Sequence, residues 1–194
     1  MSQNEKSLRM VTTNRNKFLE ARNILAEFQI NLIQVEQDRV EIQADNPEEV
    51  ARFSAEAAAR QLGGSLIVED AGLFIQHLRG FPGPYSSYIL SKIGLDGVLK
   101  LMEGVQDRKA YFKSAVAFCE AAGSPIMVFT GVVGGTISRE RRGEGGFGYD
   151  PLFIPSEGDG RTFAEMSSLE KASLSHRGKA LREFGKWFTR TNDS

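Results

Sequence analysis

The chain has 194 residues, 41% of them hydrophobic and 25% charged, and its 24 Lys and Arg side chains nearly balance its 25 Asp and Glu side chains. The resulting net charge of −1 argues against a general duplex-binding surface, which needs a strong basic excess. No apolar stretch approaches the ~20 residues of a membrane span, and the start MSQNEKSLR has no signal-peptide core, so we expect a cytoplasmic protein without a membrane partner.

The first part of the chain alternates between strand and helix patterns. The apolar run LRMVTT (residues 8–13) predicts a short buried strand, and residues 16–28 predict a helix because their apolar side chains recur at helical spacing. Residues 30–36 and 65–75 predict two further strands, with a helix over residues 45–64 between them. This β-α-β-α-β order favours an α/β fold with a layered sheet.

The second of these helices carries clear signals at both ends. Asn46 is a typical N-cap residue, and Pro47 suits the first helical position because it lacks an N–H that would be unpaired there. Glu49 stands at the third helical position, and Gly63 marks the stop. The sequence therefore predicts where this helix begins and ends.

The middle of the chain does not continue this alternation of strands and helices. Residues 79–87 (RGFPGPYSS) predict a rigid Pro-Gly turn, and residues 87–104 predict one or two short helices. Two long strand patterns, residues 109–121 and 125–138, flank the turn AGS and predict an antiparallel hairpin. The only cysteine, Cys119, lies in the first of them; one cysteine excludes a disulfide framework, and an apolar setting makes it a poor nucleophile.

The stretch TTNRNK (residues 12–17) joins the first strand to the first helix. Hydroxyls, amides and the free N–H groups of a helix N-terminus meet there, an arrangement that suits a phosphate group. The alternative is a simple helix cap, since Thr and Asn cap helices widely. Lys17 favours the phosphate, because a cation in the first helical turn opposes the helix dipole. The GxxxxGK[ST] pattern of a Walker-type loop is absent.

The stretch VEDAGL (residues 68–73) places two acids at the end of an apolar run. Ligands of α/β proteins gather at the carboxyl ends of strands, so Glu69 and Asp70 are candidate bases or metal ligands. Adjacent strand residues point to opposite faces, so only one of the two can serve a given site. Glu41, in the polar stretch before the second helix, would form a two-carboxylate site with Asp70. Such a site suits magnesium bound to nucleotide phosphates better than zinc.

The glycine-rich stretch GEGGFGYDPLF (residues 143–153) contains two aromatic rings. Exposed rings gain nothing in water, so they need a partner. We interpret the stretch as a slim backbone against which a purine lies, with Phe147 or Tyr149 as the platform. A turn at Gly148 would make the two rings face opposite ways. Asp150 either reads the base or fixes the loop.

The tail predicts helix from residue 168 to about residue 190. In a single continuous helix Arg177 would fall on the apolar stripe, where an unpaired charge is costly. Alternatively, Ser175 caps a new helix that begins with His176 and Arg177. In both cases an anionic partner explains Arg177 better than solvent does. Lys171 adds a second cation nearby, and His176 is expected to be a hydrogen-bond donor rather than a metal ligand.

In this order, the motifs TTNRNK, VEDAGL, GFPGPYSS, GGFGYDPLF and EKASLSHRGKAL resemble the inosine triphosphate pyrophosphatase family over residues 10–184. The resemblance implies one elongated α/β domain over residues 1–194, with a long twisted mixed sheet and flanking helices that form two lobes around a central cleft. It also implies a homodimer that binds no nucleic acid stably. The implied reaction is magnesium-dependent hydrolysis of ITP, dITP and XTP to the monophosphate and pyrophosphate, which cleanses the nucleotide pool.

The resemblance assigns roles to individual residues. Asp70 corresponds to the proton acceptor, and Glu41 and Asp70 correspond to the Mg²⁺ ligands. The matching substrate-binding positions, from the phosphate turn to the base end of the pocket, are Thr12, Thr13, Asn14, Arg15, Asn16, Lys17, Ala71, Phe147, Gly148, Tyr149, Asp150, Lys171, His176 and Arg177. The sequence departs from the pattern at Ser54 and Ser87, where some relatives carry lysines that contact phosphate.

Three other functions fit the sequence less well. A Maf-like pyrophosphatase acting on pyrimidine or modified nucleotides would share the phosphate turn, but not the FGYD and SHR motifs in this arrangement. A nucleotide-binding regulator without catalysis would tolerate loss of the acids, whereas Glu41 and Asp70 are both present. RNA binding lacks the broad basic patch that it needs.

Overall fold

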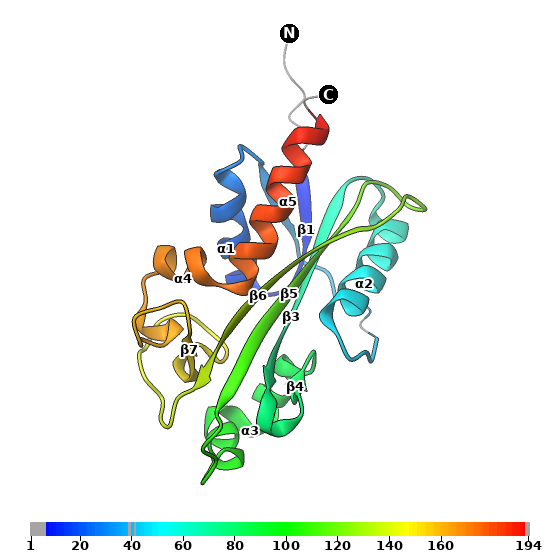
Figure 1. Cartoon of the computed structure of the whole chain (residues 1–194). Coiled ribbons are helices and arrows are strands. Elements are labelled where there is room, and N and C mark those ends of the chain that lie inside the picture. The colour runs from blue at the N-terminus through cyan, green and yellow to red at the C-terminus, as the bar shows by residue number, and fades with distance from the viewer. Residues whose placement is uncertain (1–6, 39, 41, 193–194) are drawn as a thin grey trace.

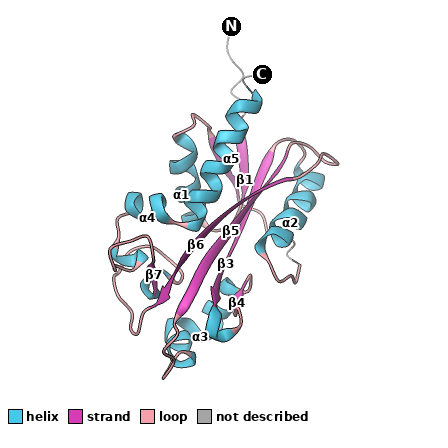
Figure 2. Cartoon of the chain, in the orientation of Figure 1, coloured by secondary structure: helices cyan, strands magenta, loops and turns pink. Residues whose placement is uncertain are grey.

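The computed structural model describes residues 7–38, 40 and 42–192, and Figures 1 and 2 show one mixed sheet with helices packed on it. The strands are β1 (Leu8–Val11), β2 (Leu32–Val35), β3 (Leu66–Ile75), β4 (Pro82–Gly83), β5 (Lys109–Cys119), β6 (Met127–Ile137) and β7 (Phe153–Pro155). The α-helices are α1 (Arg15–Ala26), α2 (Pro47–Leu62), α3 (Ser86–Leu101), α4 (Ser168–Leu174) and α5 (His176–Asn192).

The strands lie in the order β2-β1-β3-β5-β6-β7, and β4 pairs with β3 beside this path. β1 is parallel to β2 and β3, whereas β3, β5, β6 and β7 pair antiparallel in succession. The predicted β-α-β-α-β opening forms the parallel half, and the predicted hairpin forms the antiparallel half. The expected α/β class with a mixed sheet is therefore confirmed.

Alternate residues of β3 build separate hydrophobic clusters on the two faces of the sheet. Leu66 and Val68 pack with the alanines of α2, whereas Ile67 packs with side chains of α1 and α5. Figure 1 shows α1 and α5 together on one side of the long strands and α2 on the other. Cys119 is buried on the α2 side, and burial raises the pKa of its thiol.

The predicted helix ends are confirmed for α2. Asn46 precedes the helix in an extended conformation, and its side chain accepts a hydrogen bond from Glu49 N at 3.0 Å. Pro47 is the first helical residue, and Gly63 follows the last with φ 61°. The run predicted as one or two short helices is broken inside α3 at Gly94, which has φ 63° and ψ −172°.

The tail forms two helices, which settles the alternative left open by the sequence. Ser175 has an extended ψ of 152° between α4 and α5, and its Oγ accepts a hydrogen bond from Gly178 N at 3.0 Å. The start of α5 packs directly on β6: a side chain at Gly131 would collide with the carbonyl oxygen of His176. This close packing fixes where His176 and Arg177 lie. Among the described residues, no helix has the length and apolar character needed to cross a membrane.

Candidate active site

The edge of β3 that faces β1 and β4 has an open stretch. β1 pairs with β3 only as far as Met10 opposite Ile67, and β4 pairs with it from Leu73 onward. Ala71 lies between these two pairings and is the one residue of β3 that is not buried. A ligand at this edge can therefore contact the backbone of Ala71. From there it can reach side chains on both faces of the sheet.

The turn between β1 and α1 has the conformation of a capped helix N-terminus. Thr12 Oγ1 accepts a hydrogen bond from Asn14 N, and Asn14 Oδ1 accepts one from Lys17 N, each at 3.1 Å. Asn14 is thus the N-cap, as the simpler interpretation held. The N–H groups of Arg15 and Asn16 have no acceptor in the described part of the chain. This turn therefore still offers an anion two N–H groups and the positive end of the helix dipole.

Lys17 has an acidic partner within the protein. Its Nζ lies 2.9 Å from Oε2 of Glu69, and its side chain is only 15% exposed. Lys17, in the first turn of α1, therefore faces Glu69 of β3. This contact connects the turn of residues 12–17 to the centre of the sheet.

Glu69 and Asp70 point to opposite faces of the sheet, as the alternation of a strand predicts. Glu69 lies on the α5 side, where its Oε1 accepts a hydrogen bond from Ser114 Oγ at 2.6 Å. Asp70 is buried on the α2 side, opposite Ala115, which packs in the same cluster as the alanines of α2. The two acids therefore belong to different surroundings.

A chain of ion pairs runs from Glu69 to the glycine-rich loop. Arg177 Nε lies 3.1 Å from Glu69 Oε1, and Arg177 Nη1 lies 2.6 Å from Glu20 Oε2. Lys171 Nζ lies 2.8 Å from Glu20 Oε1 and 2.6 Å from Asp150 Oδ2. The anionic partners expected for Arg177 are therefore protein carboxylates, and together they hold the two cations of the tail in fixed positions.

The pKa shifts of Glu69 and Arg177 favour the charged form of both groups in the folded protein. Burial alone would raise the pKa of Glu69, but Arg177 and Lys17 outweigh burial and hold that pKa well below its ordinary value. Burial likewise disfavours the charged form of Arg177, yet Glu69 and Glu20 raise its pKa further. The network is thus a set of mutually compensated charges inside the protein.

The two rings of the glycine-rich loop have different environments, which answers the question that the sequence left open. Tyr149 is buried in a hydrophobic cluster, and its hydroxyl donates to the carbonyl oxygen of Ser86 at 2.7 Å. Phe147 is partly exposed, with Lys171 Nζ 4.5 Å from its ring centroid. Gly148 has φ 68°, so the predicted turn is present. Phe147 is therefore the ring available as a platform, and Tyr149 anchors the loop.

Asp150 holds this loop in place. Its Oδ2 accepts hydrogen bonds from Phe147 N at 2.7 Å and from Lys171 Nζ at 2.6 Å. A side chain at Gly146 would collide with this carboxylate, so only glycine fits there. Burial raises the pKa of Asp150, and Lys171 partly offsets that effect. Of the two roles considered for Asp150, the geometry favours fixing the loop.

His176 is buried and stacks on Phe112, with ring centroids 4.5 Å apart and planes at 9°. Burial and the neighbouring charge of Arg177 lower its pKa well below the ordinary value, so the imidazole is neutral at physiological pH. Its Nδ1 is buried without a hydrogen-bond partner in the described part of the chain. His176 therefore offers a neutral ring nitrogen beside the two cations of the tail.

Several aspects of the site could not be read from the sequence or lie outside the structure. Glu41, predicted as a metal ligand with Asp70, lies outside the described residues. The described residues contain no group of three or more His, Cys, Asp or Glu side chains that could hold a metal ion.

The sequence did not identify Glu20 as part of the site. The only signal for it was an acidic residue one helical turn after Lys17. Ser54, one of the two departures from the family pattern, is buried and donates to the carbonyl oxygen of Val40 at 2.9 Å.

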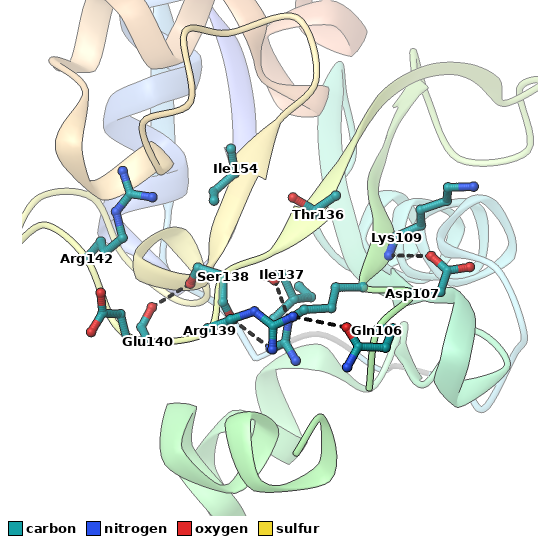
Figure 3. Close-up of a pocket in the computed structure, with 11 residues that line it drawn as sticks. Gln106, Asp107, Lys109, Thr136, Ile137, Ser138, Arg139, Glu140, Arg142 and Ile154 are labelled. Atoms are coloured by element: carbon teal, nitrogen blue, oxygen red, sulfur yellow. Dashed lines mark hydrogen bonds between the residues drawn. The ribbon is translucent and has the colours of Figure 1, made fainter. Parts of the chain in front are cut away.

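A pocket of about 570 Å³ lies away from these residues, where β5 begins and β6 ends (Figure 3). None of the predicted site residues lines it.

The chain is similar to proteins of known class over most of its length. Residues 8–187 match the Ham1 family. A dITP/XTP pyrophosphatase of Methanopyrus kandleri is 51% identical over 177 residues, which are 91% of this chain and 93% of that protein. A dITP/XTP pyrophosphatase of Thermococcus kodakarensis is 47% identical over 180 residues, 93% and 96% of the two chains.

Solved structures give the same result for the fold. A HAM1 protein from Coxiella burnetii superposes with a TM-score of 0.84 at 33% identity, covering 95% of this chain and 98% of that one. The Ham1 protein of Staphylococcus aureus superposes with a TM-score of 0.80 at 27% identity, covering 94% and 98%. The predicted α/β architecture is therefore the architecture of these proteins.

Proposed function

This chain belongs to the Ham1 family, and from that membership we propose that it hydrolyses non-canonical purine nucleoside triphosphates, namely ITP, dITP and XTP, to the monophosphate and pyrophosphate. The observation that carries the proposal is the set of contacts in which Glu69 of β3 pairs with Lys17 of α1 and with Arg177, whose guanidinium lies over the Phe147 ring, in a chain 51% identical to a dITP/XTP pyrophosphatase. Its substrates are free nucleotides of the cytoplasm, and we place its action there.

The phosphate chain would bind at the turn of residues 12–17. The N–H groups of Arg15 and Asn16 and the dipole of α1 all favour an anion at this point. Lys17 is close enough to divide its charge between Glu69 and a phosphate oxygen. An attack on phosphorus depends more on neutralised charge than on a strong nucleophile, so these groups would stabilise the transition state.

The purine would lie against Phe147. Gly148 carries no side chain on this loop, so a base can approach the backbone closely, and N–H groups there can donate to a 6-keto oxygen. Adenine carries an amino group at that position and would leave such a donor unpaired, which is costly. The same end of the site contains His176, whose imidazole is neutral. It also contains Lys171 and Arg177, which both pair with the carboxylate of Glu20.

We propose Mg²⁺ as the cofactor, held by Asp70 and Glu41. Carboxylate oxygens are the donors that Mg²⁺ prefers, and nucleotide enzymes commonly supply only one or two of them beside the phosphates. The buried carboxylate of Asp70 fits that donor type. When bound, the ion supplies charge neutralisation at the phosphates. Asp70 itself would orient the attacking water and accept its proton.

The proposed activity predicts a strong preference among substrates. With Mg²⁺ present, purified protein should release pyrophosphate from dITP and XTP with kcat/KM about 10²-fold or more above that for ATP, because ATP leaves a keto-directed donor unpaired. GTP serves as a second comparison, since it shares the 6-keto group. Equal rates on dITP and ATP would contradict the proposed specificity, and release of orthophosphate alone would contradict the proposed bond cleavage.

We also propose a homodimer, as the resemblance implies. Apolar side chains are exposed along β4 and the start of α3: Phe81 is 38% exposed, Tyr85 41% and Tyr88 61%. Clusters of large exposed apolar residues typically mark interfaces, and a second copy of this chain is the proposed occupant.

The dimer is tested by mass in solution. Analytical ultracentrifugation should give twice the chain mass of 21.4 kDa for the wild type. Tyr88→Glu should shift the protein toward monomer, because the new charge would be buried in the interface. Leu169→Glu, at an 82% exposed position on α4, is the control and should leave the mass unchanged. A monomeric wild type would refute the proposed dimer.

A further inference from the structure

We propose that Lys113 of β5 binds the phosphate chain of the substrate on the α2 face of the sheet, beside Asp70. This inference rests on the proposed function. Neither the motifs of the sequence nor the ion-pair network of the α5 face includes this residue.

The sheet register places Lys113 next to Asp70. Lys113 is opposite Gly72 on β3, and Asp70 is opposite Ala115, two residues further along β5. Ala115 packs against α2, so Lys113 shares that face by strand alternation. Diagonal neighbours of this kind have Cβ atoms about 7–8 Å apart, within reach of a lysine side chain. Gly72 itself carries no side chain, and the backbone of Gly83 in β4 lies so close to it that a Cβ there would collide with the Gly83 carbonyl oxygen.

Three other cations of the candidate site are on the opposite face. Lys17 and Arg177 pair with Glu69, and Lys171 pairs with Glu20 and Asp150. A triphosphate that reaches Asp70 brings several negative charges next to a buried carboxylate, so a protein cation on this face would add to the neutralisation that the proposed Mg²⁺ supplies.

Helix α2 does not supply that cation in the described structure. Arg52 donates to the carbonyl oxygen of Ile126, and Arg60 pairs with Glu56 one turn earlier on the same helix. Among the described residues, Lys113 is therefore a cation that the sheet register places on the α2 face beside Asp70.

The ion pair with Glu48 holds Lys113 in place without occupying all of its hydrogen-bond donors. Its Nζ forms an ion pair with Oε1 of Glu48 in the first turn of α2, and the two side chains are 26% and 28% exposed. The other oxygen, Glu48 Oε2, is buried without a hydrogen-bond partner among the described residues. An ammonium group has three donors, so this one can keep Glu48 and also bind a phosphate oxygen. Glu48 would then orient Lys113 before the substrate arrives.

A purely structural role is the competing explanation, because this ion pair also joins α2 to β5. The two explanations differ in what they predict for pyrophosphate, the product that contains only the phosphate end of the substrate. A phosphate ligand predicts weaker pyrophosphate binding when Lys113 is lost. A structural ion pair predicts the same effects from the loss of either partner.

The test compares Lys113→Gln, Lys113→Arg and Glu48→Gln with the wild type, using KM for dITP and inhibition constants for pyrophosphate and IMP. Lys113→Gln should raise KM and the pyrophosphate inhibition constant by about tenfold or more, the effect of one charge-assisted hydrogen bond, and should change the IMP constant less. Lys113→Arg should recover part of the loss. Lys109→Gln is the matched control: it removes the same charge from the same face of β5, four residues away, and should change none of these constants.

Two outcomes would overturn the inference. One is a Lys113→Gln variant whose constants for dITP and pyrophosphate match the wild type. The other is a Glu48→Gln variant that weakens pyrophosphate inhibition as much as Lys113→Gln does, since that result assigns the effect to the ion pair. A wild-type protein that releases no pyrophosphate from dITP would refute the proposed function instead, so the two failures are distinguishable.

Discussion

Replacing Asp70 by asparagine is expected to lower kcat for dITP hydrolysis by about 10²–10⁴-fold, the usual contribution of a positioned general base. Asparagine has nearly the same size and shape as aspartate, so the packing beside Ala115 can be retained. What is lost is the negative charge and the ability to accept a proton from water. The measurement is the steady-state rate of pyrophosphate release with Mg²⁺, together with thermal unfolding of the same variant.

The control for Asp70→Asn is Asp96→Asn, the same chemical change at an exposed residue of α3 that pairs with Arg141. It should leave kcat within a few-fold of the wild type. If Asp70→Asn keeps near-wild-type kcat while folding normally, Asp70 is not the proton acceptor. If Asp70→Asn loses both activity and folding, Asp70→Glu separates the two causes. This variant keeps a carboxylate, so it should fold, and it should recover activity if the carboxylate is what catalysis needs.

The sequence predicted the local features of the fold well because their signals are local. Asn46, Pro47 and Gly63 mark the ends of α2 by their own backbone preferences, and no distant contact is needed to interpret them. The opposite orientations of Glu69 and Asp70 follow from strand alternation alone. The same holds for the turn at Gly148, which depends on a positive φ.

The sequence did not predict the partners of the buried charges, because those partners are distant along the chain. Glu20 and Arg177 are 157 residues apart in the sequence, yet Arg177 Nη1 lies 2.6 Å from Glu20 Oε2. No periodicity indicates which turn of α1 faces the start of α5. The sequence indicated only that Arg177 needs an anion, and the structure shows that two carboxylates of the protein meet that need.

The buried position of Glu69 predicts a large loss of stability on substitution. Glu69→Gln should lower the free energy of unfolding by about 3–5 kcal/mol, because it removes the carboxylate that pairs with Lys17 and leaves the buried Arg177 with Glu20 as its remaining ion-pair partner. For a chain of this length, that corresponds to a fall in melting temperature of roughly 10 °C. Glu157→Gln, which removes the exposed partner of Lys179, is the matched control and should change stability little.

Double substitution separates the charge effect from a packing effect. If uncompensated charge is the cause, Glu69→Gln combined with Arg177→Met should cost less than the sum of the single losses, because the second change removes part of the charge that the first leaves unpaired. Additive losses would instead assign the effect to packing. Chemical denaturation of the four proteins measures the coupling directly.

The pH dependence of stability gives an independent check on Glu69. Its pKa in the folded state is held below its ordinary value of 4.5, so the unfolded chain takes up the proton more readily. The stabilisation is therefore present above pH 4.5 and is lost as the pH falls below that value. Wild-type melting temperature should drop in this acid range, and Glu69→Gln should show a shallower drop because it lacks the titrating group. Parallel profiles for the two proteins would mean that other carboxylates carry the acid sensitivity.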